Sequence, residues 1–244
     1  MCIGMSYEGD VHSRNLNLER FELNYRNSRM VVLSDKNLRN EAQKELEKNY
    51  LLLEDYIRKE PFFMLSYEPF RVEADAPKIA MAMSNAAEKA NVGPMASVAG
   101  AFSEIVMNSL LNRGARNAIV DNGGDISLTT TNEIYVGIYA GSSPFSGKIA
   151  LRIKPELTPL GICTSSGSVG HSISLGNSDA VVVVAKSTPL ADAAATSIGN
   201  VVKGKNAIMK GIKGAKRIKH ISGVIIIKGK EIGVYGKLPE IIKL

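Results

Sequence analysis

The chain has 244 residues, of which 45% are hydrophobic and 22% charged, a balance typical of a globular protein that buries a sizeable core. Trp is absent and aromatic residues make up 6%, which argues against a surface of stacked aromatics for single-stranded nucleic acid. Two cysteines and three scattered histidines are too few for a disulfide framework or a zinc site, and they fit a reducing compartment.

The charge is unevenly placed along the chain. The formal net charge is +6, yet residues 201–244 alone carry eleven Lys and Arg against two Glu. Such a segment can attract nucleic acid or a phosphorylated ligand, although a solvated lysine face is the commoner explanation. No apolar run is long enough to cross a membrane, and the N-terminus lacks the pattern of a secretory signal. We therefore expect a cytoplasmic protein with no membrane association, for which nucleic acid is an unlikely partner.

The N-terminal region predicts a strand pair followed by a long helix. Alternating apolar residues indicate strands over 16–24 and 29–33, which we expect to pair antiparallel. An amphipathic pattern then predicts a helix that begins with Ser34 or Asp35 as its cap and runs to about Lys59.

Two further helices are predicted before the middle of the chain. Residues 62–72 are apolar and indicate extended chain, and residues 75–91 form a helical pattern opened by Asp and Pro. The small residues of 92–104 then lead into a helix that ends at Gly114. Small residues at a helix start admit a phosphate to the free N–H groups there, but tight helix packing would favour the same composition.

The middle of the chain predicts strands and two glycine-containing loops. A strand over 118–120 leads into Asp-Asn-Gly-Gly-Asp at 121–125, which indicates a tight hairpin turn and also allows close approach of a ligand. Strands are expected at 134–140 and 148–153. Residues 161–172 are rich in Gly and Ser and predict a loop, either an ordinary one or one whose hydroxyls and amides bind phosphate or ribose oxygens.

The most informative stretch is T-P-L-A-D-A-A-A-T-S-I-G at 188–199, directly after an apolar strand at 180–185. Pro near the start of an alanine-rich segment predicts a helix capped by Ser187 or Thr188. Asp192 and Thr196 then lie one turn apart on one face, where a carboxylate and a hydroxyl can bind Mg²⁺. A helix-dipole role for the Asp and a backbone-bonded Thr are the alternatives.

The C-terminal part predicts a short helix at 206–212 and a hairpin of strands at 220–227 and 231–235. With no internal repeat or linker, the chain is expected to form one α+β domain over 1–244, with an antiparallel sheet and several long helices.

Three segments together resemble one family: the small-residue run into a helix, the G-G-D turn after an apolar strand, and the T-S-S-G loop followed by a strand and A-D-A-A-A-T. They are similar to the ApbE-like proteins, whose known members are flavin transferases that cut FAD and attach FMN to a Thr or Ser of a target protein. The resemblance covers roughly residues 90–200 and is closest to a branch of the superfamily found in archaea and some bacteria. It implies an ApbE-like, T-fold-related domain.

The resemblance also implies a ligand set. Mg²⁺ bound to the FAD pyrophosphate would be held by Asp192 and Thr196, with a backbone carbonyl near Ser97 or Val98 as a third ligand. Either His171 or Asp125 would be the base that deprotonates the acceptor hydroxyl. The cofactor-binding positions expected from the small-residue run, the G-G-D turn and the T-S-G loop are Gly93, Ser97, Gly100, Gly123, Gly124, Thr164, Ser165 and Gly167.

Departures from the family pattern keep a second hypothesis open. Where transferases read K-G-Y-A-V-D, residues 99–104 read A-G-A-F-S-E, without the lysine and the tyrosine. The leading hypothesis is a Mg²⁺-dependent enzyme acting on FAD, with a nucleotide-type small molecule and an acceptor protein as partners. The alternative is a protein that binds a flavin, another nucleotide or a phosphorylated metabolite without turnover. A monomer and a homodimer both remain open.

Overall fold

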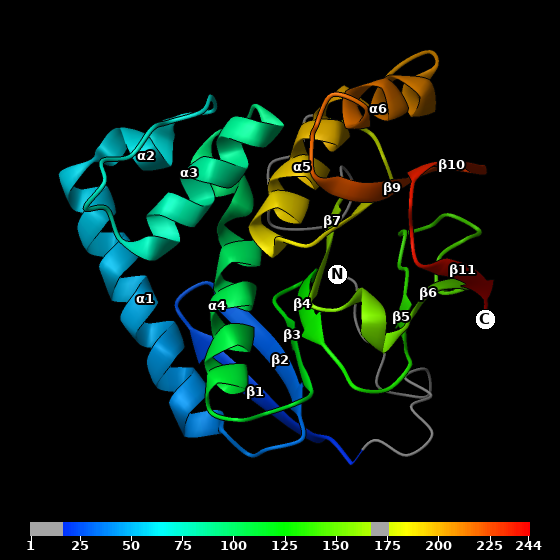
Figure 1. Cartoon of the computed structure of the whole chain (residues 1–244). Helices are drawn as coiled ribbons and strands as arrows, with labels where there is room; N and C mark the ends of the chain where they lie inside the picture. The colour runs from blue at the N-terminus through cyan, green and yellow to red at the C-terminus, as the bar shows by residue number, and fades with distance from the viewer. Residues whose placement is uncertain (1–16, 167–175) are drawn as a thin grey trace.

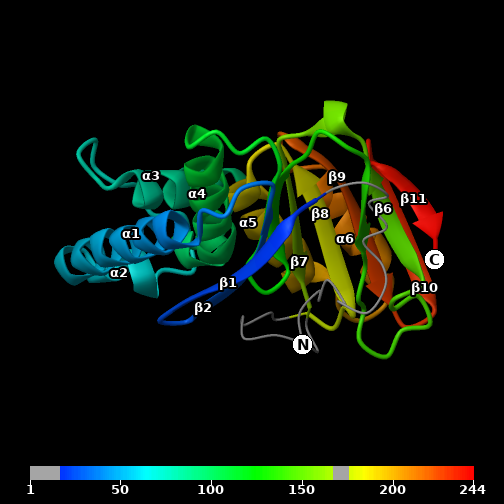
Figure 2. The ribbon, with the colours of Figure 1, turned by 90° about the horizontal axis from the view of Figure 1, so that it is seen from below.

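The computed structural model describes residues 17–166 and 176–244, which form two antiparallel sheets and a set of helices arranged in three layers (Figures 1 and 2). Sheet A contains, in spatial order, β1 (Glu19–Tyr25), β2 (Ser28–Ser34), β3 (Ala118–Asp121), β4 (Asp125–Thr129), β7 (Leu160–Ser165), β8 (Ala180–Ala185), β9 (Ile221–Lys228) and β10 (Glu231–Gly236). Sheet B contains β11 (Glu240–Lys243), β6 (Ile149–Ile153) and β5 (Ile134–Gly137). The predicted antiparallel α+β architecture is confirmed.

The helices cover one face of sheet A, and sheet B packs against the other. They are α1 (Arg39–Lys59), α2 (Pro61–Leu65), α3 (Lys78–Ala90), α4 (Val98–Asn112), α5 (Thr188–Val201) and α6 (Ala207–Ala215), with short 3₁₀ turns η1 (Pro94–Ser97) and η2 (Pro155–Leu157). In the part of the chain that the structure describes, none of these helices combines the length and the apolar composition that a bilayer crossing requires.

Strand alternation divides the core between the two faces of sheet A. On β4, Ile126 and Leu128 point towards sheet B, while Ser127 between them points towards the helices and contacts Met107 of α4. Each large aliphatic side chain buried in these layers contributes about 1.5–3 kcal/mol relative to its exposed state. Alternate residues along each strand of sheet A therefore face the helices, and the residues between them face sheet B.

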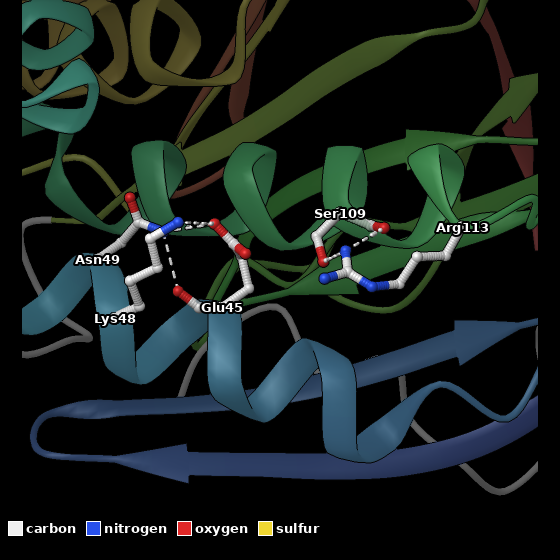
Figure 3. A network of polar contacts seen from close by, with 5 residues as sticks. All are labelled: Glu45, Lys48, Asn49, Ser109 and Arg113. Atoms are coloured by element: carbon white, nitrogen blue, oxygen red, sulfur yellow. Dashed lines mark hydrogen bonds and ion pairs between the residues drawn. The ribbon is translucent and has the colours of Figure 1, made fainter.

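Helix α1 lies beside α4 at the outer end of the helical layer (Figure 3). The Tyr50 ring of α1 stacks on the Phe102 ring of α4 with centroids 4.2 Å apart. Polar side chains on both helices bond within their own helix: Asn49 donates to the Glu45 carbonyl at 2.9 Å, and Arg113 donates to the Ser109 hydroxyl at 2.8 Å. The stacked rings therefore join the two helices, while the hydrogen bonds of these polar side chains each stay within one helix.

Two predicted secondary structures are wrong. The chain at 62–72 was expected to be extended, but Pro61–Leu65 forms α2, because Pro61 has the φ angle suited to the first turn of a helix. The chain from 161 was expected to be a loop, but Leu160–Ser165 forms β7 in the middle of sheet A. Glycine is needed at position 161 of this strand, because a Cβ there would come 2.6 Å from the Thr188 Cα of α5. Small residues that suggest a loop instead allow close packing.

The predicted cap of α1 is wrong, and that of α5 is correct in position only. Helix α1 begins after Leu38 with no side-chain cap, and Asp35 instead accepts the N–H groups of Arg116 and Asn117 at 3.0 and 3.2 Å. Ser187 occupies the N-cap position of α5, yet it makes no side-chain capping bond. The N–H of Thr188 donates instead to the Glu104 carboxylate of α4, at 2.6 Å.

Each of the helices α4 and α5 supplies a carboxylate that accepts a backbone N–H at the start of the other helix. Glu104 of α4 accepts the first N–H of α5, and Asp192 of α5 accepts the N–H of Gly100 in the first turn of α4 at 2.8 Å. Each carboxylate thus pairs with backbone N–H groups that have no hydrogen-bond acceptor within their own helix. The close approach requires Gly100, since a Cβ there would lie 2.7 Å from the Thr188 carbonyl oxygen and 2.9 Å from the Asp192 Cβ.

We expect Glu104→Ala to lower the free energy of unfolding by about 1–2 kcal/mol, because it leaves the partly buried Thr188 N–H without an acceptor. Burial raises the pKa of the Glu104 carboxyl, and the bonds from Thr188 only partly oppose this. The native protein therefore binds this proton more tightly than the unfolded chain. The stability that this group contributes is fully present below about pH 4.3 and is lost as the pH rises through the raised native pKa.

Urea unfolding of wild type, Glu104→Ala and Glu104→Gln between pH 4 and pH 8 measures both effects. Glu104→Gln keeps an acceptor oxygen and removes the ionisation, so its stability should depend less on pH than that of wild type. Equal pH dependence in wild type and Glu104→Gln would show that this carboxyl does not titrate as expected.

Gly100→Ala should lower the free energy of unfolding by about 1–3 kcal/mol, because the added methyl group has no room between α4 and α5. Gly214→Ala on α6 is the matched control. A Cβ at Gly214 would meet only the Val201 side chain, at 3.4 Å, so the higher helix propensity of Ala should make this variant as stable as wild type or more so. Thermal unfolding of both variants checks the contrast, and a stable Gly100→Ala would contradict the tight contact.

Candidate functional site

Three segments far apart in sequence meet on the helix side of sheet A: the first turn of α4, the first two turns of α5, and the β3–β4 turn. The Ser103 hydroxyl of α4 lies 2.6 Å from the Asp125 carbonyl oxygen, and the Asn122 side chain donates to the Ala99 carbonyl at 3.2 Å. The bond from Gly100 to Asp192 attaches α5 to the same turn of α4. The structure thus brings together the predicted positions of the small-residue run, the G-G-D turn and the A-D-A-A-A-T helix.

The β3–β4 turn is tight, as the Asn-Gly pair predicts. Gly123 and Gly124 have φ angles of 72° and 105°, in the left-handed region that favours glycine. The Gly124 N–H donates to the Asp121 carboxylate at 2.7 Å. Gly123 is exposed and Gly124 is buried, so the outer half of the turn is open to a ligand while the inner half is part of the fold.

Asp125 holds a buried carboxyl oxygen in this site. It is the first residue of β4, its cross-strand neighbour on β7 is Cys163, and within the described residues its Oδ1 has no hydrogen-bond partner. Burial raises the pKa of Asp125 well above its usual range, and the Asp192 and Asp121 carboxylates raise it further. The Cys163 thiol and the Thr164 N–H oppose the shift. This carboxyl therefore favours a proton or a cation.

Asp192 lies beside it on α5. Burial raises its pKa to about 7, against the stabilising N–H groups of Gly100 and Ala99. Among the described residues, no Lys or Arg is among the groups that shift the pKa of Asp125 or Asp192. Two adjacent carboxylates without a basic neighbour repel each other, and a bound cation would relieve this repulsion.

Thr196 follows Asp192 by one turn of α5 and is partly buried. Within residues 17–166 and 176–244, no three His, Cys, Asp or Glu side chains gather as a metal-binding group. A cation at this site would therefore rely on the two carboxylates together with hydroxyl and backbone oxygens, an all-oxygen donor set of the kind that Mg²⁺ prefers.

The β7 positions Thr164 and Ser165 point to opposite faces of sheet A. Thr164 pairs with Val182 of the sheet B core, whereas Ser165 pairs with Val181 on the helix side, the side of Asp125. Both hydroxyls are buried without a hydrogen-bond partner in the described part of the chain. Ser165 thus presents its side chain to the site, and Thr164 presents its N–H. Gly167 and His171 lie outside the described residues.

Two predicted cofactor-binding residues have structural contacts of their own. A Cβ at Gly93 would overlap the Ser66 carbonyl, so glycine is needed there for packing. Ser97 is fully buried, and its hydroxyl donates to the Pro94 carbonyl at 2.8 Å. The free N–H groups expected at the start of α4 are also engaged, because Asp192 supplies the anion there.

The roles of two residues in this site were not predicted from the sequence. Glu104 caps α5, but its partner is far away in the sequence and no local pattern reveals it. Cys163 is fully buried, and its Sγ lies 3.4 Å from the Thr188 carbonyl oxygen. Burial raises the pKa of this thiol well above its usual value, as do the Asp125 and Asp192 carboxylates, so the thiol is protonated and is not a nucleophile at neutral pH.

A hollow of about 580 Å³ lies at the β1–β2 hairpin. Asn24 and Arg29 line it, together with Ser28, whose hydroxyl lies 3.5 Å from the Asn122 side chain of the β3–β4 turn. The exposed side of the turn therefore opens next to a polar concave surface.

Comparison with known proteins identifies the family. The family model described as "AbpE bacteria" matches residues 11–223. The UPF0280 protein of Methanococcus vannielii is 48% identical over 206 residues, which is 83% of each chain, and that of Methanocaldococcus jannaschii is 44% identical over 219 residues, 88% of each chain.

Solved structures share the fold at low identity. The flavinyl transferase ApbE of Pseudomonas stutzeri superposes with a TM-score of 0.59 at 14% identity, over 90% of this chain and 94% of that one. The ApbE protein of Thermotoga maritima superposes with a TM-score of 0.54 at 13% identity, over 88% and 96% of the two chains. The chain therefore belongs to the AbpE bacteria family, is related to the UPF0280 proteins of Methanococcus vannielii and Methanocaldococcus jannaschii, and has the ApbE fold.

Proposed function

We propose that this protein is a Mg²⁺-dependent enzyme that binds FAD, cleaves its pyrophosphate and transfers FMN to a Thr or Ser hydroxyl of an acceptor protein. The observation that carries the proposal is the pair of partly buried carboxyl groups of Asp125 and Asp192, both with raised pKa values, beside the glycine turn in an ApbE fold.

The residues present fit a hard cation. The Asp125 Oδ1 has no hydrogen-bond partner within the described residues, and the carboxylate of Asp192 and the hydroxyl of Thr196 supply oxygen donors of the kind that Mg²⁺ prefers. Asp192 and Thr196 would hold Mg²⁺, which when bound would neutralise charge on the pyrophosphate oxygens. The N-termini of α4 and α5 are already capped by Asp192 and Glu104, so within the described residues the exposed backbone of Gly123 in the β3–β4 turn would be offered to the ligand phosphates.

Asp125 is the proposed base. Its Oδ1 has no hydrogen-bond partner within the described residues, so the ionised carboxylate can accept a proton from the acceptor hydroxyl. His171 is the alternative base. The Ser165 hydroxyl on the same face would position the ligand beside it.

A second candidate function is binding without turnover. It is favoured by the first turn of α4, where Ala101 and Phe102 are buried in the core and the lysine and tyrosine of the transferase pattern are missing. Calorimetric titration with FAD in the presence of Mg²⁺, combined with product analysis, separates the two. Tight binding without AMP formation would favour the binding protein.

Purified protein incubated with FAD and Mg²⁺ should release AMP, and chelation of the metal should stop the release. Asp192→Asn should lower the rate by at least about tenfold through lost metal affinity, with partial rescue by excess Mg²⁺. Asp55→Asn, at an exposed ion pair on α1, is the matched control and should behave as wild type. Chromatography of the nucleotides measures AMP. If the protein neither binds FAD nor releases AMP, even with cell extract as a source of acceptor protein, the flavin function is ruled out.

Asp125→Asn should reduce AMP release by about 10²–10⁴-fold while FAD affinity stays within a few-fold of wild type, as expected when only proton transfer is lost. His171→Ala tested in parallel assigns the base. If Asp125→Asn keeps the wild-type rate and His171→Ala loses it, His171 is the base and Asp125 has another role.

A further inference from the structure

Strand β10 forms a free edge of sheet A. It pairs with β9 and with no other strand of the described chain, and Figures 1 and 2 place it at the margin of the molecule, away from the helices α1 to α3. An edge strand leaves half of its N–H and C=O groups available to another polypeptide strand.

The residues of β10 do not protect this edge. Ile232 and Val234 in the middle of the strand are 40% and 48% exposed, whereas the basic residues Lys230 and Lys237 lie just beyond its two ends. Edges that avoid pairing usually carry a charge, a proline or a bulge within the strand. Here the middle is apolar and regular, so the lysines do not block it.

The surface around β10 is strongly basic. Helix α6 packs on β10 through Ile208 against Gly233, and the Lys216 Nζ lies 5.6 Å from the centre of the Tyr235 ring. Among the described residues, no lysine between 203 and 237 forms an ion pair with an acidic side chain. The lysine charge is therefore available to a partner.

We propose that β10 is a docking edge for an extended acidic segment of a partner protein, which adds to sheet A as a further strand. The backbone of such a segment would pair with the free edge, and its acidic side chains would lie beside Lys230 and Lys237. A second copy of this chain does not fit, because antiparallel pairing of two β10 strands brings Lys230 of one copy to Lys237 of the other. Nucleic acid cannot match the N–H and C=O pattern of a strand edge.

The hairpin geometry identifies the outward backbone groups. Gly229 and Lys230 form a two-residue turn, so Lys228 and Glu231 are a hydrogen-bonded pair and alternate residues from Glu231 face β9. The N–H of Val234 then faces outwards. Val234→Pro removes this donor while leaving the bonds to β9, as prolines on edge strands do.

The experiment uses a fluorescein-labelled peptide of alternating Glu and Val, eight residues long, and measures its anisotropy with the full-length protein at low salt. Wild type should bind it, and Val234→Pro should weaken binding by about tenfold or more, whereas the matched control Val234→Ala should stay within about twofold. A peptide of alternating Lys and Val should not bind. Affinity for the acidic peptide should fall as salt rises.

Circular dichroism and thermal unfolding check that Val234→Pro is folded. The double variant Lys230→Glu/Lys237→Glu gives an independent test that leaves the backbone unchanged. It should no longer bind the acidic peptide and should bind the basic one. The proposal is overturned if wild type does not bind the acidic peptide, if folded Val234→Pro binds as wild type does, or if the charge reversal leaves the preference unchanged. A dimer that Val234→Pro dissociates in sedimentation would overturn it in favour of a second copy.

Discussion

The reciprocal exchange of carboxylates between α4 and α5 is the interaction on which the site depends. Glu104 neutralises the start of α5 and Asp192 neutralises the start of α4, so two helix N-termini that would otherwise repel lie side by side. The contact requires Gly100 in α4 and Gly161 in β7, because a side chain at either position would push α5 away. The position of Asp192 beside Asp125 follows from this packing.

The contact between α4 and α5 also determines which groups are available to bind a ligand. Helix N-termini usually offer unpaired N–H groups to phosphates, but here internal carboxylates engage them. The site therefore presents negative charge where an anion site was expected, and a phosphorylated ligand would need a cation between itself and the protein. The segment 201–244 carries the opposite charge on a surface formed by α6 and β10, so acidic and basic features are separated along the chain.

The sequence predicted those features that depend on local pattern. Alternation located β1 and β2, Asn-Gly located the β3–β4 turn, and Pro189 near the start of an alanine-rich run located α5. The rest depends on contacts between distant segments. Nothing near Glu104 indicates that it caps a helix 84 residues later, and the Gly and Ser of β7 resemble a loop until α5 is seen against them. Strand β11 was missed because its partner β6 lies far back in the chain.

The pairing of β11 also has a consequence for folding kinetics. In sheet A, β1–β2, β3–β4 and β9–β10 are hairpins, whereas β2 and β3 pair across residues 35–117, which contain α1 to α4. Sheet B contains a similarly distant pair, since Leu151 of β6 pairs with Ile241 of β11 across most of the C-terminal half. Closing such long loops costs entropy before any contact compensates it, which places both the β2–β3 pairing and the completion of sheet B late on the folding pathway. Until then the sheet B side of the β4 core, including Ile126 and Leu128, is only partly covered.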